Sequence, residues 1–289
     1  DHRDLHSFPT RRSSDLYPKV SAEDTAEAKK KGGNRSFTDS QHGAIANWDD
    51  FETYPWPDPD KYTTRGLEWL TKNLPDDMCI IGGQLGHYAE LLSWLLGYEP
   101  LCFMLSDNPD LVQAVVDRVM AIEQRAIDIL LQFERVKIIW GSDDMGFKTG
   151  TLISPKDLRR FVFPGHKALA EKTHAAGRTY FLHSCGQLEK VMDDLIDDVK
   201  IDAKHSFEDV ITPVEEMKKR YGKRVSLLGG MDVDLLCRAD EKTIRQRVRS
   251  MVDACQPGGG WCLGTGNTVA NYIPLDNYLA MMDEGANSR

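Results

Sequence analysis

The segment VKIIWGSDD, residues 136–144, is a short run of β-branched and aromatic residues that ends in two carboxylates. Its apolar residues do not alternate cleanly with polar ones, which is typical of a strand buried on both faces of a parallel sheet. Five further segments share this character, at residues 78–83, 179–186, 201–207, 224–232 and 259–267. The sequence therefore predicts six buried strands.

Amphipathic stretches separate the predicted strands. In residues 106–133 apolar side chains recur at helical spacing, with Asn108 as an N-cap and Pro109 in the first turn. The same pair of signals occurs at Ser154–Pro155 and at Thr212–Pro213. Further helices are predicted at residues 154–161, 188–199, 212–222 and 243–255.

Strands that alternate with helices predict a parallel sheet with helices outside it, either an open doubly wound sheet or a (β/α)8 TIM barrel. No GxGxxG or GxxxxGK[ST] motif follows any predicted strand, which weakens the nucleotide-binding open sheet. Polar residues collect at the strand ends instead, as in a barrel whose strand ends surround one mouth. We therefore predict a barrel that is truncated at its N-terminus, because only about six of eight βα units are found.

The first sixteen residues, DHRDLHSFPTRRSSDL, match the translation of a common short-read sequencing adapter without a mismatch. We expect residues 1–16 to be non-native and not to pack on the rest of the chain. Residues 17–289 are then predicted to form a single barrel domain that is incomplete at its N-terminus.

Composition narrows the classes of partner. The net charge is -9 and no basic stripe is visible, which argues against binding nucleic acid. The apolar runs are too short to span a membrane. The six cysteines are scattered and form no CxxC motif, so a reducing cytoplasm is the expected location.

His183 and Cys185 stand two residues apart at the end of a predicted strand, so their side chains should point to the same side. An imidazole and a thiolate side by side make half of a tetrahedral zinc site. Cys262 or one of His205, Asp143 and Asp144 could complete it. Alternatively, the two residues form a neutral pair without a metal.

The adjacent Asp143 and Asp144 should point to opposite sides, so only one is expected in the barrel mouth. Either carboxylate could be the general acid, general base or ligand, and we favour Asp144 over Asp143. The alternative is that one aspartate caps a helix or fixes a loop and the other is exposed to solvent. His205 is predicted to donate a proton or to assist a metal, with a structural hydrogen bond as the alternative. His166 and His174 are expected on the surface of a helix.

Five other residues are predicted to bind substrate because they follow strands. Lys204 and Asp232 end two strands, and the glycines after the last strand could bind an anion through their N–H groups. The alternatives are a helix cap for Asp232 and a tight turn for the glycines. The predicted set is Lys204, Asp232, Gly264, Gly266 and Asn267.

Three long segments together resemble the uroporphyrinogen decarboxylase superfamily, in the right order and over roughly residues 50–286. They are residues 141–186, which end in HSCG, residues 202–236, which begin with DAKHSFED, and residues 264–285, which begin with GTGN. The resemblance implies a (β/α)8 barrel that acts with a tetrapyrrole. Some members decarboxylate uroporphyrinogen, and others use zinc to move a methyl group between a corrinoid and a thiol such as coenzyme M.

In the methyltransferase branch the His-x-Cys pair supplies two zinc ligands, here His183 and Cys185. A cysteine in the loop after the last strand supplies the third, and Asn267 stands at that place in this chain. The resemblance therefore favours zinc-assisted methyl transfer with a corrinoid protein and a small thiol as partners. Uroporphyrinogen decarboxylation, which needs no cofactor, is the second expectation. A non-catalytic tetrapyrrole-binding barrel or inactive fragment is the third.

Overall fold

A computed structural model describes residues 19–22, 35–38 and 42–288 of the chain. Residues 1–16 lie outside these ranges, so the expectation that they are non-native stays a prediction. The described chain folds as two compact units. Unit 1 takes in the described residues up to Asp143 together with Ile153–Tyr180, and unit 2 takes in Asp144–Leu152 and the residues from Phe181 onward.

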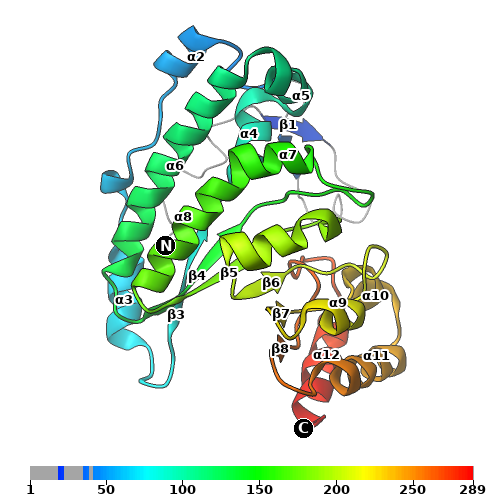
Figure 1. The fold of residues 1–289 in the computed structure, drawn as a ribbon. Coiled ribbons are helices and arrows are strands. Elements are labelled where there is room, and N and C mark those ends of the chain that lie inside the picture. Colours follow the sequence, from blue (N-terminus) through cyan, green and yellow to red (C-terminus); the bar gives the residue numbers. More distant parts are fainter. Residues whose placement is uncertain (1–18, 23–34, 39–41, 289) are drawn as a thin grey trace. The chain divides into compact units, whose positions relative to one another are not determined.

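Six parallel strands follow one another in the order β3-β4-β5-β6-β7-β8, and each lies within a segment that the sequence predicts as a strand, apart from the last residues of β3 (Figure 1). This consecutive order of parallel strands, with helices between them, is that of a (β/α)8 barrel. The fold class predicted from the sequence is confirmed. The strands are β3 Ile80–Leu85, β4 Val136–Ser142, β5 Thr179–His183, β6 Ala203–His205, β7 Ser226–Leu228 and β8 Trp261–Cys262. Another pair, β1 Lys19–Ala22 and β2 Arg35–Thr38, is antiparallel and lies outside this sheet.

Helices fill the connections between the strands. In unit 1 they are α2 Trp48–Thr53, α3 Arg65–Asn73, α4 Tyr88–Leu96, α5 Tyr98–Asp107, α6 Pro109–Leu131, α7 Pro155–Asp157 and α8 Phe163–Ala175, with the short helical turns η2 Pro59–Lys61 and η3 Leu158–Val162. In unit 2 they are η4 Glu189–Val191, η5 Asp194–Val199, α9 Val214–Tyr221, α10 Val233–Arg238, α11 Glu241–Cys255 and α12 Leu275–Asn287.

Two of the three predicted helix starts are confirmed. The Asn108 side chain accepts from the Leu111 N–H at 3.4 Å, and Pro109 is the first residue of α6. Ser154 Oγ accepts from the Asp157 N–H at 3.2 Å and caps α7. The prediction for Thr212 was wrong by one residue, because Pro213 is the N-cap of α9 and makes no side-chain cap.

The core of unit 1 is built on α6. Its buried stripe runs from Leu111 through Val115 and Val119 to Leu130, at the spacing of one helix face. This stripe faces α4, α5, α8 and β3, and Figure 1 shows α6 running alongside α8. Burial of such a stripe stabilises a domain by roughly 1.5–3 kcal/mol for each large aliphatic side chain.

The core of unit 2 lies between its strands and its C-terminal helices. The helix α11 packs against α9 and α12, and buries Ile244, Val248 and Met251 on one face. Beside this buried face α11 carries Arg247, which pairs with Glu215 of α9 and with Asp209. These contacts hold the helices against the strands that carry the polar residues described below.

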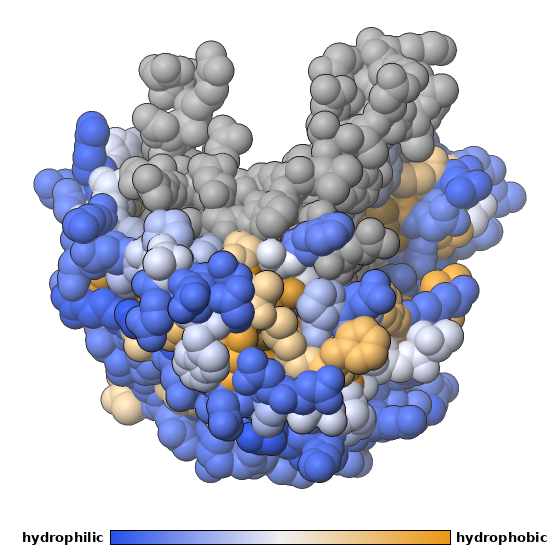
Figure 2. Space-filling model, turned by 90° about the horizontal axis from the view of Figure 1, so that it is seen from above, coloured by the Kyte–Doolittle hydropathy of each residue, from blue (hydrophilic) through white to orange (hydrophobic). Residues whose placement is uncertain are grey.

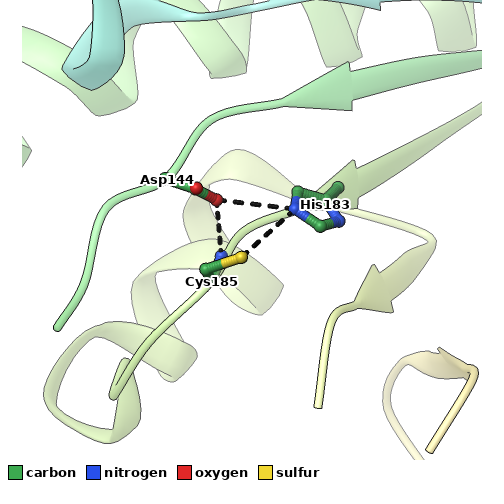
Figure 3. Close-up of side chains that lie close together, drawn as sticks. All are labelled: Asp144, His183 and Cys185. Carbon is green, nitrogen blue, oxygen red and sulfur yellow. Dashed lines mark hydrogen bonds and ion pairs between the residues drawn. The ribbon is translucent and has the colours of Figure 1, made fainter. Parts of the chain in front are cut away.

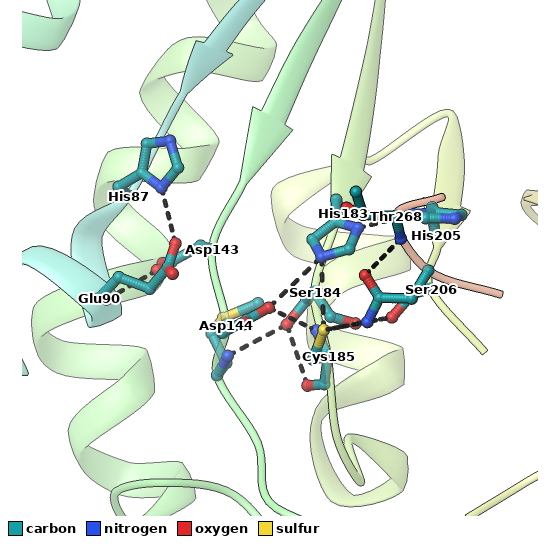
Figure 4. A network of polar contacts seen from close by, with 12 residues as sticks. His87, Glu90, Asp143, Asp144, His183, Ser184, Cys185, His205, Ser206 and Thr268 are labelled. Carbon is teal, nitrogen blue, oxygen red and sulfur yellow. Dashed lines mark hydrogen bonds and ion pairs between the residues drawn. The ribbon is translucent and has the colours of Figure 1, made fainter. Parts of the chain in front are cut away.

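Asp143 and His166 form a fully buried polar network in unit 1 (Figure 4 shows Asp143). The Asp143 carboxylate accepts from the N–H groups of Ala89 and Glu90, both at 2.9 Å, and so caps the N-terminus of α4. His166 Nε2 lies 2.9 Å from Asp143 Oδ2, and His166 Nδ1 lies 2.9 Å from the Tyr180 hydroxyl. The surface position predicted for His166 was wrong, since buried partners satisfy both of its ring nitrogens.

No helix in the described ranges is long and apolar enough to cross a membrane. On the face that Figure 2 shows, hydrophilic residues make up most of the coloured surface, with a few hydrophobic residues between them. The high charged fraction of the sequence, 28%, explains this surface.

Glu123 offers a test of the unit 1 core. Burial raises the pKa of Glu123 from 4.5 to about 7, although His87 and the Gly86 N–H act in the opposite direction. The folded state thus holds a proton that the unfolded state releases, and stability should fall as pH rises from about 4.5 to about 7. Glu123→Gln has no carboxyl to ionise and should not lose this stability. Its free energy of unfolding relative to the parent should therefore rise by about 2 kcal/mol from pH 5 to pH 8.

Urea unfolding at both pH values measures this difference. Glu171→Gln, on an exposed position of α8, is the matched control and should follow the parent at both pH values. A Glu123→Gln variant whose stability relative to the parent is the same at pH 5 and pH 8 would contradict the buried, protonated carboxyl.

Candidate metal and catalytic site

Three potential ligands come together in unit 2: Asp144, His183 and Cys185 (Figure 3). His183 is the last residue of β5, Cys185 follows two residues later, and Asp144 lies two residues beyond β4. His183 Nε2 is 3.4 Å from Asp144 Oδ1 and 3.4 Å from Cys185 Sγ. The expected juxtaposition of His183 and Cys185 is therefore present, and Asp144 is the carboxylate that joins them.

A tight turn fixes the position of Cys185. Gly186 has a φ of 85°, which favours glycine, and a Cβ on it would lie 2.1 Å from the carbonyl carbon of Gly146. The Cys185 N–H donates to Asp144 Oδ1 at 2.9 Å. The backbone after β5 is thus held against the segment after β4, which brings the thiol beside the carboxylate.

The charges of Asp144 and Cys185 are coupled. Burial would raise the pKa of Asp144, but hydrogen bonds with His183 and with the thiol and N–H of Cys185 outweigh it and lower the pKa to about 2. Burial and the neighbouring Asp144 charge raise the pKa of Cys185 to about 12. The metal-free site therefore holds a carboxylate and a protonated thiol at neutral pH.

Two side chains donate to the sulfur of Cys185 from other loops. Asn267 Nδ2 lies 3.3 Å from Sγ, and Ser206 Oγ lies 3.5 Å from it. Both hydrogen bonds lower the pKa of Cys185, although less than burial raises it. Asn267, predicted to bind substrate, thus contacts the sulfur at the place where the resemblance expects a third cysteine ligand.

The imidazole rings of His183 and His205, both in unit 2, are in contact (Figure 4). Their Nδ1 atoms are 2.6 Å apart, and His205 Nε2 lies 3.2 Å from the Thr265 carbonyl oxygen. Burial, followed by the nearby His183, lowers the pKa of His205 to about 4, so this ring is neutral at pH 7. His205 contacts the back of the His183 ring rather than the cluster of three donors.

Lys204 is buried, with 3% of its surface exposed. Its ammonium donates to the carbonyl oxygens of Ser184 at 3.0 Å and of Ser206 at 2.9 Å. Burial lowers the pKa of Lys204 to about 8, partly offset by Cys185 and Asp144. The hydrogen bonds join the chain beyond β5 to the chain beyond β6, and substrate binding by Lys204 stays a prediction.

The remaining predicted residues make backbone contacts or lie apart from the cluster. Asp143 caps α4 in unit 1, which was the alternative left open for one of the two aspartates. Asp232 caps α10 through the N–H groups of Asp234 and Leu235, at 2.8 and 3.1 Å. The structure places Cys262 in β8, exposed and outside the group of three donors.

The glycines of the last loop pair with the loop after β7. The N–H of Met231 donates to the Gly264 carbonyl at 3.0 Å, and the N–H of Gly266 donates to the Met231 carbonyl at 2.6 Å. A Cβ on Gly266 would lie 2.0 Å from the Phe207 carbonyl oxygen, so only glycine fits there. These hydrogen bonds join the loop after β8 to the loop after β7, and an anion site at Gly264 and Gly266 stays a prediction.

Sequence reasoning did not single out Ser206 or Thr265. Ser206 directly follows the predicted site residue His205, and Thr265 lies between the predicted Gly264 and Gly266. Their position next to predicted site residues is the signal in the sequence that could have identified them. Which of these neighbours turns toward the sulfur or the imidazole depends on loop geometry that no spacing rule gives.

The donor set of the cluster matches zinc. Nitrogen, thiolate sulfur and carboxylate oxygen are its usual protein ligands at about 2.0–2.3 Å. Two ligands of a regular tetrahedral site are then about 3.3–3.8 Å apart. The two 3.4 Å separations from His183 Nε2 fall within this range. Asp144, His183 and Cys185 could therefore hold a zinc ion by three bonds and leave a fourth position for a ligand.

The order of the parallel strands is that of a (β/α)8 barrel, and a His-x-Cys pair stands at the end of one of these strands. The family model of uroporphyrinogen decarboxylase (URO-D) matches residues 39–287, and the chain belongs to this family. The family predicted from the residues is thereby confirmed.

Two curated relatives carry different activities in their names. A methylated-thiol–coenzyme M methyltransferase of Methanosarcina mazei is 26% identical over 240 residues, which cover 79% of this chain and 60% of the relative. A uroporphyrinogen decarboxylase of Pseudoalteromonas atlantica is 24% identical over 256 residues, which cover 83% of this chain and 68% of the relative. The chain thus spans 60% of the length of the methyltransferase relative and 68% of that of the decarboxylase relative.

A solved structure described as a methyltransferase from Methanosarcina mazei is similar in fold. It has a TM-score of 0.66 at 17% sequence identity, and the match covers 88% of this chain and 72% of that one. At this identity the likeness bears on the fold alone, and it agrees with the barrel class.

The coupling of Asp144 with Cys185 is open to a direct test in the metal-free protein. We expect Asp144→Asn to lower the pKa of the Cys185 thiol, because a negative charge that raises it is removed. For each unit of decrease, the thiolate fraction and hence the alkylation rate at pH 8 should rise about tenfold. Alkylation of the Cys185 peptide, followed by mass spectrometry in the presence of a chelator, measures the rate.

The exposed Cys262 serves as the internal control, since its alkylation should be the same in both proteins. An equal or slower rate at Cys185 in the variant would contradict the coupling.

Proposed function

We propose that this chain is an enzyme of zinc-assisted methyl transfer between a corrinoid and a thiol. One observation carries the proposal. His183 Nε2 lies at tetrahedral spacing, 3.4 Å, from Asp144 Oδ1 and from Cys185 Sγ, and donor atoms of all three residues lie within 4.8 Å of one another. Catalytic zinc sites have this arrangement of three protein ligands and a free position, whereas structural sites are closed by four.

A zinc ion in this site would lower the pKa of a bound thiol and so supply a thiolate nucleophile at neutral pH. The chain's own groups would prepare the site. The proton of Cys185 must leave before its sulfur can act as a ligand, and the hydrogen bonds from Asn267 and Ser206 stabilise the resulting thiolate. Asp144 is already ionised, because its pKa is held at about 2.

The departure from a second cysteine ligand has a chemical consequence. With Asp144 in place of a thiolate, the ligand set would remain two anions and one neutral imidazole, and the total charge with Zn²⁺ would be zero. Asn267, which stands where the resemblance expects the cysteine, would act as a hydrogen-bond donor to the remaining sulfur. The proposal thus assigns ligand roles to Asp144, His183 and Cys185 and a supporting role to Asn267.

The partners follow from the reaction. A methyl-carrying corrinoid, bound to a protein, would be the donor, and a small thiol would be the acceptor. The methyltransferase relative names a thiol substrate and coenzyme M, which supports this class of partner. That relative is longer than the region shared with this chain, so the identity of donor and acceptor is part of the proposal.

Zinc content tests the ligand assignment. We expect the parent to bind about one zinc per chain, and His183→Ala, Cys185→Ser and Asp144→Ala each to weaken binding at least tenfold, because each removes one of three bonds. Metal analysis after dialysis and competition with a chromophoric chelator provide the measurement. Cys262→Ser is the matched control for a cysteine and should bind as the parent does. Equal zinc in the parent and the three ligand variants would refute the site.

Demethylation of methylcobalamin in the presence of a thiol tests the activity. We expect thiol-dependent loss of the methyl group with the parent and at least a hundredfold slower reaction with Cys185→Ser, since this variant lacks a ligand of the zinc ion that would bind and activate the thiol. Absorbance of the corrinoid follows the reaction. A parent that binds zinc but shows no thiol-dependent reaction would refute methyl transfer while leaving the metal site intact.

Decarboxylation of uroporphyrinogen is the second candidate, and the Pseudoalteromonas relative is the observation that favours it. This reaction would use no metal, so coproporphyrinogen should form at the same rate with and without a chelator. Formation of that product by the parent, together with unchanged activity of Cys185→Ser, would replace the first proposal with the second. Zinc binding without either reaction would favour a binding role.

A further inference from the structure

We propose that the outer side of α12 is a docking surface for an amphipathic helix of a partner protein, one that carries Lys or Arg beside its apolar residues. The surface consists of an apolar seam, Leu275, Leu279 and Met282, and of two carboxylates beside it, Asp276 and Asp283. The proposal goes beyond the proposed methyl transfer and does not depend on it, since none of these residues belongs to the three-donor cluster.

The helix α12 is apolar on two opposite sides. On its inner side Ala280 and Met281 are buried, and α12 packs against α11 (Figure 1). On its outer side Leu275, Leu279 and Met282 are 67%, 52% and 48% exposed. A surface helix usually has one apolar stripe, and a helix that is apolar on all sides is usually buried. The outer side of α12 is thus suited to a second neighbour.

Polar contacts on the inner side hold α12 in place. Asn277 Nδ2 donates to the backbone carbonyls of Leu236 at 2.8 Å and of Ala239 at 3.1 Å, at the end of α10. Glu284 is only 13% exposed and pairs with Arg245 of α11 at 3.2 Å. The helix is therefore fixed by α10 and α11, and its outer side is presented to solvent without taking part in these contacts.

The exposed apolar residues have the spacing of a coiled-coil seam. Leu279 follows Leu275 by four residues, Met282 follows after three more, and Ala286, also exposed, after another four. This alternation of four and three is that of the a and d positions of a heptad repeat, at which one helix contacts another. The occupant that fits the seam is therefore a helix that lies along α12 with its own apolar residues at the same spacing.

Acidic residues border the seam on one side. Asp276 and Asp283 each follow a seam residue by one position, which makes both of them e positions of the same heptad. Asp283 is 57% exposed although it pairs with Arg245 at 2.6 Å, and Asp276 is exposed as well. The sequence of α12 contains no Lys, Arg or His. A partner helix with Lys or Arg opposite these positions would gain ion pairs, whereas one with Asp or Glu would be repelled.

The same charges argue against two other occupants. In an antiparallel pair of α12 helices from two copies of the chain, e positions face e positions, so aspartates would oppose aspartates. In a parallel pair they would face the g positions, Tyr278 and Gly285, which offer no cation. An anionic membrane surface attracts Lys and Arg rather than carboxylates. Charge therefore favours a basic helix of another protein over a second copy or a membrane.

Two synthetic peptides test the surface on the full chain. Each has about three heptads with Leu at a and d, and the e and g positions are Lys in one peptide and Glu in the other. We expect the lysine peptide to bind saturably and at least about tenfold more tightly than the glutamate peptide. A scrambled lysine peptide of the same composition controls for attraction to the net charge of -9 and should bind at least about tenfold more weakly. Fluorescence anisotropy of labelled peptides at about 150 mM salt measures binding.

Substitutions on α12 locate the binding. Leu279→Asn should weaken binding of the lysine peptide at least about tenfold, because it places an amide in the middle of the seam. Val210→Asn changes an apolar residue that is 67% exposed in the loop after β6, and as the matched control it should bind as the parent does. Asp276→Lys should reverse the preference between the two peptides, whereas Asp253→Lys, an equal change of charge on α11, should keep it.

Equal binding of the lysine and scrambled peptides, or binding that Leu279→Asn leaves unchanged, would overturn the proposal. So would a parent that is a dimer in sedimentation and a monomer with Leu279→Asn, because a second copy would then cover the seam. Binding to phosphatidylserine vesicles that Leu279→Asn abolishes would point to a membrane and overturn it as well. Should Leu279→Asn fail to fold, Met282→Asn provides the same test. None of these measurements involves zinc or a methyl donor, so failure of this proposal and failure of the proposed function are told apart.

Discussion

The parallel pairing of β5 with β6 is the constraint on which the candidate site depends. It places His183 opposite His205 at the strand ends, where a shift of one residue would turn one imidazole to the other face of its strand. The Cys185 side chain follows because it lies two residues after His183, on the same side. The register of the two strands thus brings His183, Cys185 and His205 close together, independently of the hydrogen bonds among their side chains.

Electrostatics then selects the protonation states within this frame. The half-exposed carboxylate of Asp144 stays ionised because it accepts hydrogen bonds from the His183 ring and from the thiol and N–H of Cys185, and its charge keeps the Cys185 thiol protonated. The buried Lys204 ammonium lies near both groups, which raise its pKa and partly offset the effect of burial. It donates hydrogen bonds to two backbone carbonyls. Removing water from these charges is tolerated because each has hydrogen-bond partners.

The sequence was sufficient for the elements that depend on local pattern. Buried strands, the N-caps at Asn108 and Ser154, and the His183–Cys185 pair all follow from residues within a few positions of each other. Contacts between distant loops were harder to predict. His166 has an ordinary helical environment in the sequence, and only the folded chain shows that Asp143 and Tyr180 satisfy its ring. Likewise, strand alternation says that adjacent aspartates diverge, but the partners of Asp143 and Asp144 are 23 or more residues away.

The close approach of Gly146 and Gly186 has a consequence for sequence divergence in this family. The two glycines lie two residues after Asp144 and one residue after Cys185, and their backbones leave no room for a Cβ on Gly186. A larger residue at 186 would separate the two loops and move the carboxylate away from the sulfur. The residues at 146 and 186 should therefore vary together with the candidate ligands. A relative that keeps the cysteine but carries a side chain at position 186 must have a different path for the loop that corresponds to the one after β4.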